Sequence, residues 1–253
     1  MTDPTTIVLV GNPAWANALT SALPPHIQLR HYTQRARYVA NLTDHRAALV
    51  LIDGQADDWP FYTTAAKSNN ATRRVPLIVV TADEITRADA LTHGADLALS
   101  PDDLLADVPS LIAQHARVAD AAQQQQLLTE CDQPLPPLAV QGVEKFNNRE
   151  FYPQHDLFEE QWVETDGPVR DLYRAVLQVG VAYYQIERGN HRGALKMLLR
   201  AVQWLEPLPD VCQTINVKQL REDAYAVRAE LERTDPADID TFDMSLLKPV
   251  QRV

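Results

Sequence analysis

Cysteine is scarce in this sequence: only Cys131 and Cys212 occur, far apart and without Cys-x-x-Cys spacing. Such usage is typical of proteins from a reducing compartment, so we expect no disulfide framework. Long apolar runs are also missing. No segment approaches the roughly 20 apolar residues that cross a bilayer, and the N-terminus lacks the basic, apolar pattern of a signal peptide. We therefore expect a soluble, cytoplasmic protein.

Positive charge is in deficit as well. The chain has 23 lysines and arginines against 34 acidic residues, which gives a net charge of −11, and both halves are acidic. Because this charge repels phosphate backbones, it argues against nucleic acid as the main partner. The hydrophobic share of 45% and the charged share of 23% are those of a folded globular protein.

The first half of the chain alternates short apolar runs with helical patterns. Runs this apolar predict strands that are buried on both faces, and the helices between them predict a parallel sheet covered on each side. Their carboxyl ends, where such sheets bind ligands, carry Gly11-Asn12, Asp53, Thr81 and Ser100. The last helix is expected over 103–118. The predicted strands cover residues 7–10, 27–32, 48–52, 77–80 and 95–99.

Residues 5–118 resemble the receiver domain of two-component response regulators. The stretches that carry the resemblance are ALVLIDG at 48–54, VPLIVVTA at 75–82 and HGADLALSPDDLLADVPSLI at 93–112. The resemblance implies a flavodoxin-like, doubly wound sheet of five parallel strands. It also implies that Asp53 takes the place of the phosphoryl acceptor and Thr81 that of the residue that senses the phosphoryl group.

Two parts of the receiver machinery are missing from the sequence. The acidic pair that holds Mg²⁺ falls on Gly11 and Asn12, and the lysine of the Lys-Pro pair falls on Ser100. Mg²⁺ prefers oxygen ligands that include carboxylates, and phosphoryl transfer needs positive charge on its oxygens. We therefore predict a pseudo-receiver in which Asp53 is not phosphorylated. Asp53 could equally be a plain turn residue, and Asp57 or Asp58 could replace a missing carboxylate or simply be solvated.

The second half of the chain has helical periodicity throughout. We divide the sequence into a receiver-like domain (1–120), a helical and proline-rich linker (121–138), a helical domain (139–234) and a loosely ordered tail (235–253). The glutamine run in the linker could extend the last receiver helix until prolines end it. Gly189 is a good stop and Asn190 a good N-cap, as is Asn216. The helices are expected at about 139–150, 153–164, 168–188, 191–206 and 216–231.

Residues 142–206 resemble the bacterial family catalogued as domain of unknown function 309. The stretches that carry this resemblance are GVEKFNNREFYPQHDLFEEQW at 142–162 and LQVGVAYYQIERGNHRGALKMLLRAVQWL at 177–205. Pro153 and Gln154 stand where the family usually has Glu and Ala, and Asp156 where it has Glu. The resemblance indicates a helical fold and implies no established activity.

His155 and Glu159 are four residues apart, so they share one helix face, and Asp156 lies beside them. These side chains could bind a divalent metal or act as an acid–base pair. A zinc site needs a third ligand, for which Glu160, Gln178 and Asn190 are the candidates. The alternative is a structural i,i+4 pair and no cofactor. We expect His191 to be exposed, and the aromatic residues at helical spacing to be core: Trp162, Tyr183, Tyr184 and Trp204.

Three functions are compatible with these patterns. The first is a non-catalytic regulatory or scaffolding protein, in which the pseudo-receiver binds a protein partner or dimerises and the helical domain is the output. The second is a metal-binding protein or enzyme that uses His155, Asp156 and Glu159. The third is a tetratricopeptide-like interaction module, because residues 182–207 resemble one helix pair of that repeat; only one such pair is visible, and a solenoid needs about three.

Overall fold

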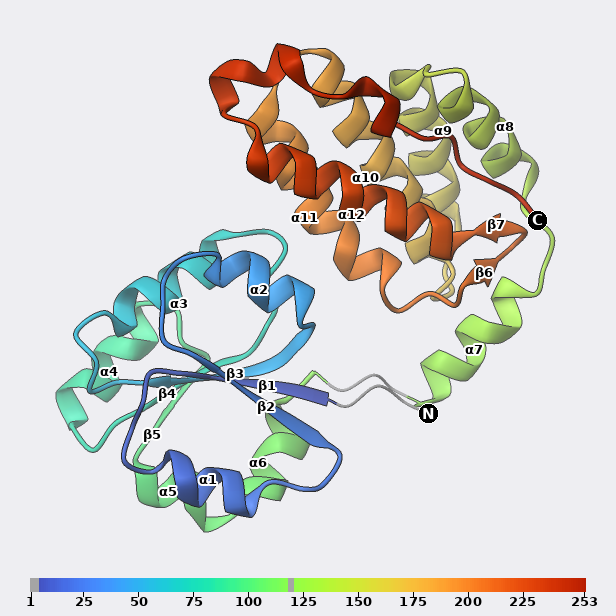
Figure 1. Ribbon diagram of the computed structural model, residues 1–253. Coiled ribbons are helices and arrows are strands. Elements are labelled where there is room, and N and C mark those ends of the chain that lie inside the picture. Colours follow the sequence, from blue (N-terminus) through green and yellow to red (C-terminus); the bar gives the residue numbers. More distant parts are fainter. Residues whose placement is uncertain (1–4, 118–120) are drawn as a thin grey trace. The chain divides into compact units, whose positions relative to one another are not determined.

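The computed structural model describes residues 5–117 and 121–253, which form two compact units divided near residue 118 (Figure 1). The first unit is α/β and the second is helical. Each has its own hydrophobic core.

The first unit is a parallel five-stranded sheet with the strand order β2-β1-β3-β4-β5. The apolar runs predicted the parallel sheet, and its order is the doubly wound, flavodoxin-like order that the receiver resemblance implied. The strands are β1 (Thr5–Val10), β2 (Ile27–Tyr32), β3 (Ala47–Asp53), β4 (Leu77–Val80) and β5 (Leu97–Leu99), and the helices are α1 (Ala16–Ala22), α2 (Tyr38–Asp44), α3 (Trp59–Ser68), α4 (Glu84–Thr92), α5 (Pro101–Ala106) and α6 (Val108–His115).

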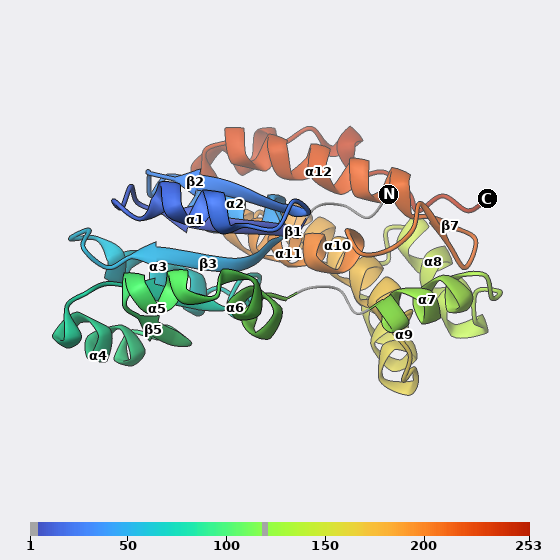
Figure 2. The ribbon, with the colours of Figure 1, turned by 90° about the horizontal axis from the view of Figure 1, so that it is seen from below.

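The central strands bury both faces because successive side chains point to opposite sides of a sheet. Val50 and Ile52 of β3 pack with α2 and α3, whereas Leu49 and Leu51 pack with α1, α5 and α6. Helices α1, α5 and α6 cover the face that is turned toward the viewer in Figure 2. This two-sided burial explains why β3 reads as an unbroken apolar run.

The single helix expected over 103–118 is wrong, because the structure has two helices that meet at Asp107. Asp107 is non-helical, with φ −154°, and its carboxylate accepts a hydrogen bond from the Ser110 N–H at 3.1 Å. Pro109 supplies the physical reason. A proline disfavours helical backbone before it and suits the first turn of a new helix. Residue 118, the predicted end, lies outside the described residues.

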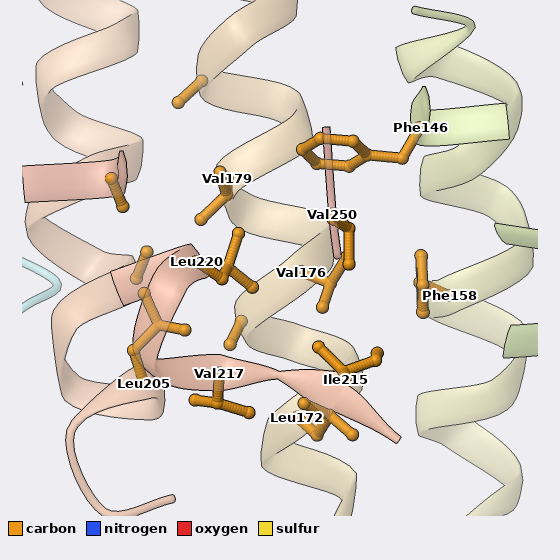
Figure 3. Packing of buried hydrophobic residues seen from close by; sticks show 14 of the residues in the cluster. Phe146, Phe158, Leu172, Val176, Val179, Leu205, Ile215, Val217, Leu220 and Val250 are labelled. Carbon is orange, nitrogen blue, oxygen red and sulfur yellow. The ribbon is translucent and has the colours of Figure 1, made fainter. Parts of the chain in front are cut away.

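The second unit contains six α-helices among its described residues, and α10 lies in the middle of its core (Figure 3). Val176 and Val179 of α10 face a cluster that includes Phe146 and Phe158 from one side and Leu220 from the other. The elements are α7 (Ala121–Cys131), α8 (Pro137–Asn147), α9 (Phe151–Glu164), α10 (Arg170–Glu187), α11 (His191–Leu205), the hairpin β6 (Val211–Cys212) and β7 (Ile215–Asn216), and α12 (Val217–Arg233).

The predicted helix signals around residues 189 and 216 are confirmed. Gly189 adopts φ +69° after α10, a backbone conformation that favours glycine. Asn190 caps α11 by accepting the Gly193 N–H at 3.0 Å. Asn216 caps α12 by accepting the Gln219 N–H at 3.0 Å.

The chain after α12 is not the loosely ordered tail that we expected. It forms the 3₁₀ helices η1 (Pro236–Thr241) and η2 (Met244–Leu246), and Val250 is buried in the core of this unit. Asn147 of α8 holds Val250 by both backbone groups, accepting its N–H at 2.7 Å and donating to its carbonyl at 3.0 Å. The apolar residues in this stretch lie in two short 3₁₀ helices and extended chain, so they show neither helical nor strand periodicity in the sequence.

The expected absence of a disulfide is also wrong, because Cys131 and Cys212 are bonded across 81 residues of sequence. The bond joins the end of α7 to the β6–β7 hairpin, where the Gln213 N–H also donates to the Cys131 carbonyl at 2.7 Å. Glu130 accepts the Val169 N–H at 2.9 Å. The glutamine-rich helix thus packs with the second unit, and it does not continue α6, which ends at His115.

No helix in the described part of the chain is both long and apolar enough to span a membrane. The disulfide removes the argument from cysteine usage that supported a reducing compartment.

Candidate functional site

A cavity of about 260 Å³ lies at the carboxyl ends of β1 and β3 in the first unit. It contains Asp53, Gly11 and Asn12, the positions on which the receiver resemblance placed the acceptor and the acidic pair. The lining also includes three residues that the sequence analysis did not name: Thr33, Ala56 and Tyr62. Its lining is Val10, Gly11, Asn12, Thr33, Asp53, Ala56, Asp58 and Tyr62.

Asp53 is held at the bottom of this cavity, only 7% exposed, with Oδ1 accepting the Gln55 N–H at 3.0 Å. Gly11 lies against it with φ +97°, in the left-handed region. A Cβ at position 11 would come within 2.7 Å of the Asp53 Cβ, closer than such atoms approach. In this conformation a side chain at position 11, including the carboxylate that the receiver resemblance would require there, would be strained and would displace Asp53.

Thr81 and Ser100 both have hydrogen-bond partners in the loops at this edge of the sheet. The buried Thr81 hydroxyl accepts from Gln55 Nε2 at 3.0 Å and from the Asp83 N–H at 3.2 Å. The Ser100 hydroxyl caps α5, accepting the Asp103 N–H at 3.1 Å and donating to the Asp103 carboxylate at 2.7 Å. Neither side chain brings positive charge to Asp53.

Asp58 is the one further carboxylate that lines this cavity among the described residues, whereas Asp57 is exposed. Asp58 forms an ion pair with Arg35 at 3.0 Å. The pKa of Tyr62 is raised, first by burial and then by the charge of Asp58. Because Asp58 already has a cationic partner, it is a poor replacement for the missing magnesium ligands.

A second cavity, of about 230 Å³, lies between α9, α10 and α11 in the helical unit. It brings together three of the residues that the sequence singled out: His155, Glu159 and Gln178. Asp156 and Asn190 do not line it. The lining is His155, Glu159, Trp162, Arg174, Leu177, Gln178, Val181, Met197 and Arg200.

The predicted metal ligands do not assemble around one point. Asp156 accepts from His155 Nδ1 at 3.1 Å but is itself well exposed, and Asn190 caps α11. Within the described ranges, no three His, Cys, Asp or Glu side chains are grouped closely enough to hold a metal ion. Arg174 and Arg200 also line the cavity, and their positive charge opposes a cation.

Arg174 was not predicted as a site residue, yet two tryptophan rings face its guanidinium group. Its guanidinium carbon lies 4.5 Å from the centre of the Trp162 ring and 3.9 Å from that of Trp204. Trp162 and Trp204 are half-buried and pack against the core of this unit, as does Tyr184, and both indole rings also face this cation. Tyr183 is core, with no exposed surface.

Gln178 reaches the cavity from the interior and is only 5% exposed. Its Oε1 is buried and has no hydrogen-bond partner within the described structure, and the same holds for the indole nitrogens of Trp162 and Trp204. A buried polar atom without a partner costs free energy, so a group that supplied the missing hydrogen bond here would be stabilised.

The match to a known family falls on this region. Residues 139–197 match the family described as Domain of unknown function (DUF309). The DUF309 match includes every residue that lines the second cavity except Arg200. No curated protein matches the chain, and no receiver family is among the matches.

His191 corrects one further prediction. It is buried rather than exposed, and its Nε2 lies 2.7 Å from the Leu231 carbonyl of α12. It joins α11 to α12 and does not line the cavity. Its position directly after the Asn190 cap gave no sequence signal for this contact.

Proposed function

We propose that the protein is a non-catalytic regulatory or scaffolding protein, in which a degenerate receiver-like unit is coupled to a DUF309-like helical output unit. The observation that carries this proposal is the contact of Gly11 with Asp53. The strand order and the placement of Asp53 and Thr81 at the carboxyl edge support the receiver resemblance. The backbone at position 11 leaves no room for the side chain of an acidic residue.

The charge at this edge supports the same proposal. Phosphoryl transfer to a carboxylate brings together two negative groups, which receivers offset with Mg²⁺ and lysine. Here Asp53 has no cationic side chain among the residues that line its cavity. Mg²⁺ dehydrates reluctantly and needs near-octahedral oxygen ligands, so one buried carboxylate and an amide at Asn12 form a weak site.

Exposed apolar side chains on the first unit support contact with a protein. Helix α4 exposes Ile85 (73%) and Leu91 (52%) to solvent. The net charge of −11 opposes nucleic acid. We therefore propose a protein partner or a second copy of this chain as the binding partner. Light scattering on the purified protein distinguishes the two, since a dimer mass assigns the contact to a second copy.

Acetyl phosphate labelling tests the central claim. We expect that the wild-type protein forms no acyl phosphate when it is incubated with acetyl phosphate and Mg²⁺. An active receiver assayed in parallel serves as the positive control. Asp53→Asn is the diagnostic variant and Asp58→Asn is its matched control at the same cavity. Labelling of the wild type that disappears in Asp53→Asn but persists in Asp58→Asn would overturn the pseudo-receiver proposal.

Elemental analysis addresses the metal-dependent alternative. That alternative requires a stoichiometric transition metal that is lost in His155→Ala. We expect the purified protein to lack one, because Arg174 and Arg200 share the cavity with His155 and Glu159.

A further inference from the structure

We propose that the cavity between α9, α10 and α11 binds a small organic carboxylate that also carries a hydrogen-bond donor beside the carboxylate, as an amino acid or a 2-hydroxy acid does. This inference concerns the helical unit alone. It goes beyond the regulatory function and does not depend on whether Asp53 is phosphorylated.

The first argument is charge. Two guanidinium groups, Arg174 and Arg200, line one small cavity in a chain whose net charge is −11. Glu159 is the one carboxylate in this lining. Guanidinium groups bind carboxylates through paired N–H donors with a geometry that matches two oxygens.

The second argument is that one of these cations is held in place before any ligand arrives. Trp162 and Trp204 both pack against the Arg174 guanidinium, at 4.5 and 3.9 Å from their ring centres. Contacts of this kind use the faces of the guanidinium plane, whereas its N–H donors lie within the plane. Fixing a long side chain in advance reduces the entropy that binding would otherwise cost.

The third argument is the presence of acceptors beside the cations. Gln178 Oε1 is a buried acceptor without a partner within the described structure, and Glu159 adds an acceptor at the exposed rim. A simple anion would leave the buried Gln178 Oε1 unsatisfied. A ligand with an ammonium or hydroxyl group next to its carboxylate can donate hydrogen bonds to these acceptors. Its carboxylate oxygens can accept hydrogen bonds from the arginines.

Size and apolar lining limit the rest of the ligand. The volume of about 230 Å³ is below the range of about 300–1,000 Å³ that is usual for drug-sized ligands. Leu177, Val181 and Met197 form the apolar part of the lining. A short aliphatic body fits these walls better than a sugar or a nucleotide does.

Three probes that differ only in the group beside the carboxylate, and a fourth that is a simple oxyanion, test the proposal. L-valine, 2-hydroxyisovalerate and isovalerate share a carbon skeleton and carry an ammonium, a hydroxyl or no donor, and inorganic phosphate is an oxyanion without a body. Each is titrated into the full chain up to about 10 mM while the tryptophan indole N–H signals are followed by NMR. Trp162 and Trp204 report on the cavity, and Trp15 and Trp59 of the first unit serve as internal controls.

We expect valine or 2-hydroxyisovalerate to shift the signals of Trp162 and Trp204 only, and to bind about tenfold or more tightly than isovalerate and phosphate. Arg200→Gln should weaken that binding by about tenfold or more, whereas Arg192→Gln should not change it, because Arg192 is exposed on the same helix outside the cavity. Glu159→Gln should reduce the preference for valine over isovalerate.

Three results would overturn the inference: no shift of Trp162 or Trp204 with any probe, equal binding of isovalerate and valine, or full binding in Arg200→Gln. Arg174→Gln is a supporting variant, since its loss could also disturb the two indole rings. Unchanged Trp162 and Trp204 signals in the ligand-free Arg200→Gln protein show that the cavity is still folded. A labelled Asp53 would refute the regulatory proposal and leave this one standing.

Discussion

Removal of the Cys131–Cys212 disulfide should strongly destabilise the helical unit and leave the α/β unit unchanged. The bond closes 81 residues of chain, and the loop-entropy relation gives about 4.5 kcal/mol at 25 °C for a loop of this length. Disulfides typically contribute about 2–4 kcal/mol. Since whole domains are stable by about 5–15 kcal/mol, the expected loss is a large fraction of the total.

The measurement is urea unfolding of the full chain, followed by circular dichroism and tryptophan fluorescence, with and without reductant. At a slope of about 2 kcal/mol per molar urea, a loss of 2–4.5 kcal/mol lowers the midpoint of the helical unit by about 1–2 M. The Cys131→Ala/Cys212→Ala variant should behave like the reduced wild type and be insensitive to reductant. Alanine is the better replacement because both sites are buried and would bury the hydroxyl of a serine.

The α/β unit provides the control within the same molecule, since neither cysteine belongs to it. Its transition should not respond to reductant. A thiol assay on the denatured, unreduced protein should detect no free thiol, and two after reduction. Detection of two thiols before reduction, or a midpoint of the helical unit that reductant leaves unchanged, would refute the reasoning.

Three further perturbations should give smaller or more local effects, each measured by urea unfolding. Phe158→Ala should cost about 3–5 kcal/mol, because Phe158 has no exposed surface, whereas Tyr152→Ala on the same helix should cost about 0.5 kcal/mol or less, because Tyr152 is 64% exposed. Asn216→Ala should cost about 1 kcal/mol through the lost cap of α12. Burial raises the pKa of Asp223, so its carboxyl group binds a proton more tightly in the folded protein than in the unfolded chain. The free energy of unfolding should therefore fall as the pH rises through this pKa. Asp223→Asn should abolish the decline, whereas Asp132→Asn at an exposed position should not.

The α/β unit could be predicted from sequence because its signals are local. A strand buried on both faces must be apolar at every position, so 48–52 and 77–80 stand out in the sequence. The caps at Asn190 and Asn216 are equally local, since each accepts an N–H three residues away. The prediction of one helix over 103–118 fails because apolar residues continue at helical spacing across the break at Asp107, whereas Pro109 interrupts the backbone there.

The remaining errors concern contacts between distant parts of the chain. Cys131 meets Cys212 across 81 residues, and Asn147 holds Val250 across 103. Such pairs depend on how helices pack, and no short pattern encodes them. The buried position of His191 has the same origin, since its partner is the Leu231 carbonyl.

The second cavity shows where reasoning from one helix stops. His155 and Glu159 were found because i,i+4 spacing places them on one face of α9. Arg174 and Arg200 come from α10 and α11, so only the packing of three helices reveals that they share a cavity with this face. The predicted chemistry changes as a result. The His155 imidazole and the Glu159 carboxylate alone suggest a bound cation, whereas the two guanidinium groups beside them favour a bound anion.

The departure of Gly11 from the receiver pattern involves the backbone as well as the side chain. Because φ is +97° and a Cβ would lie 2.7 Å from the Asp53 Cβ, an aspartate at this position would be both strained and too close. Asn12→Asp combined with Ser100→Lys should therefore fail to restore labelling by acetyl phosphate, even though it adds a carboxylate and a cation. Mg²⁺-dependent labelling of that double variant at Asp53 would show that side chains alone had been missing, and that the backbone at Gly11 does not block the site.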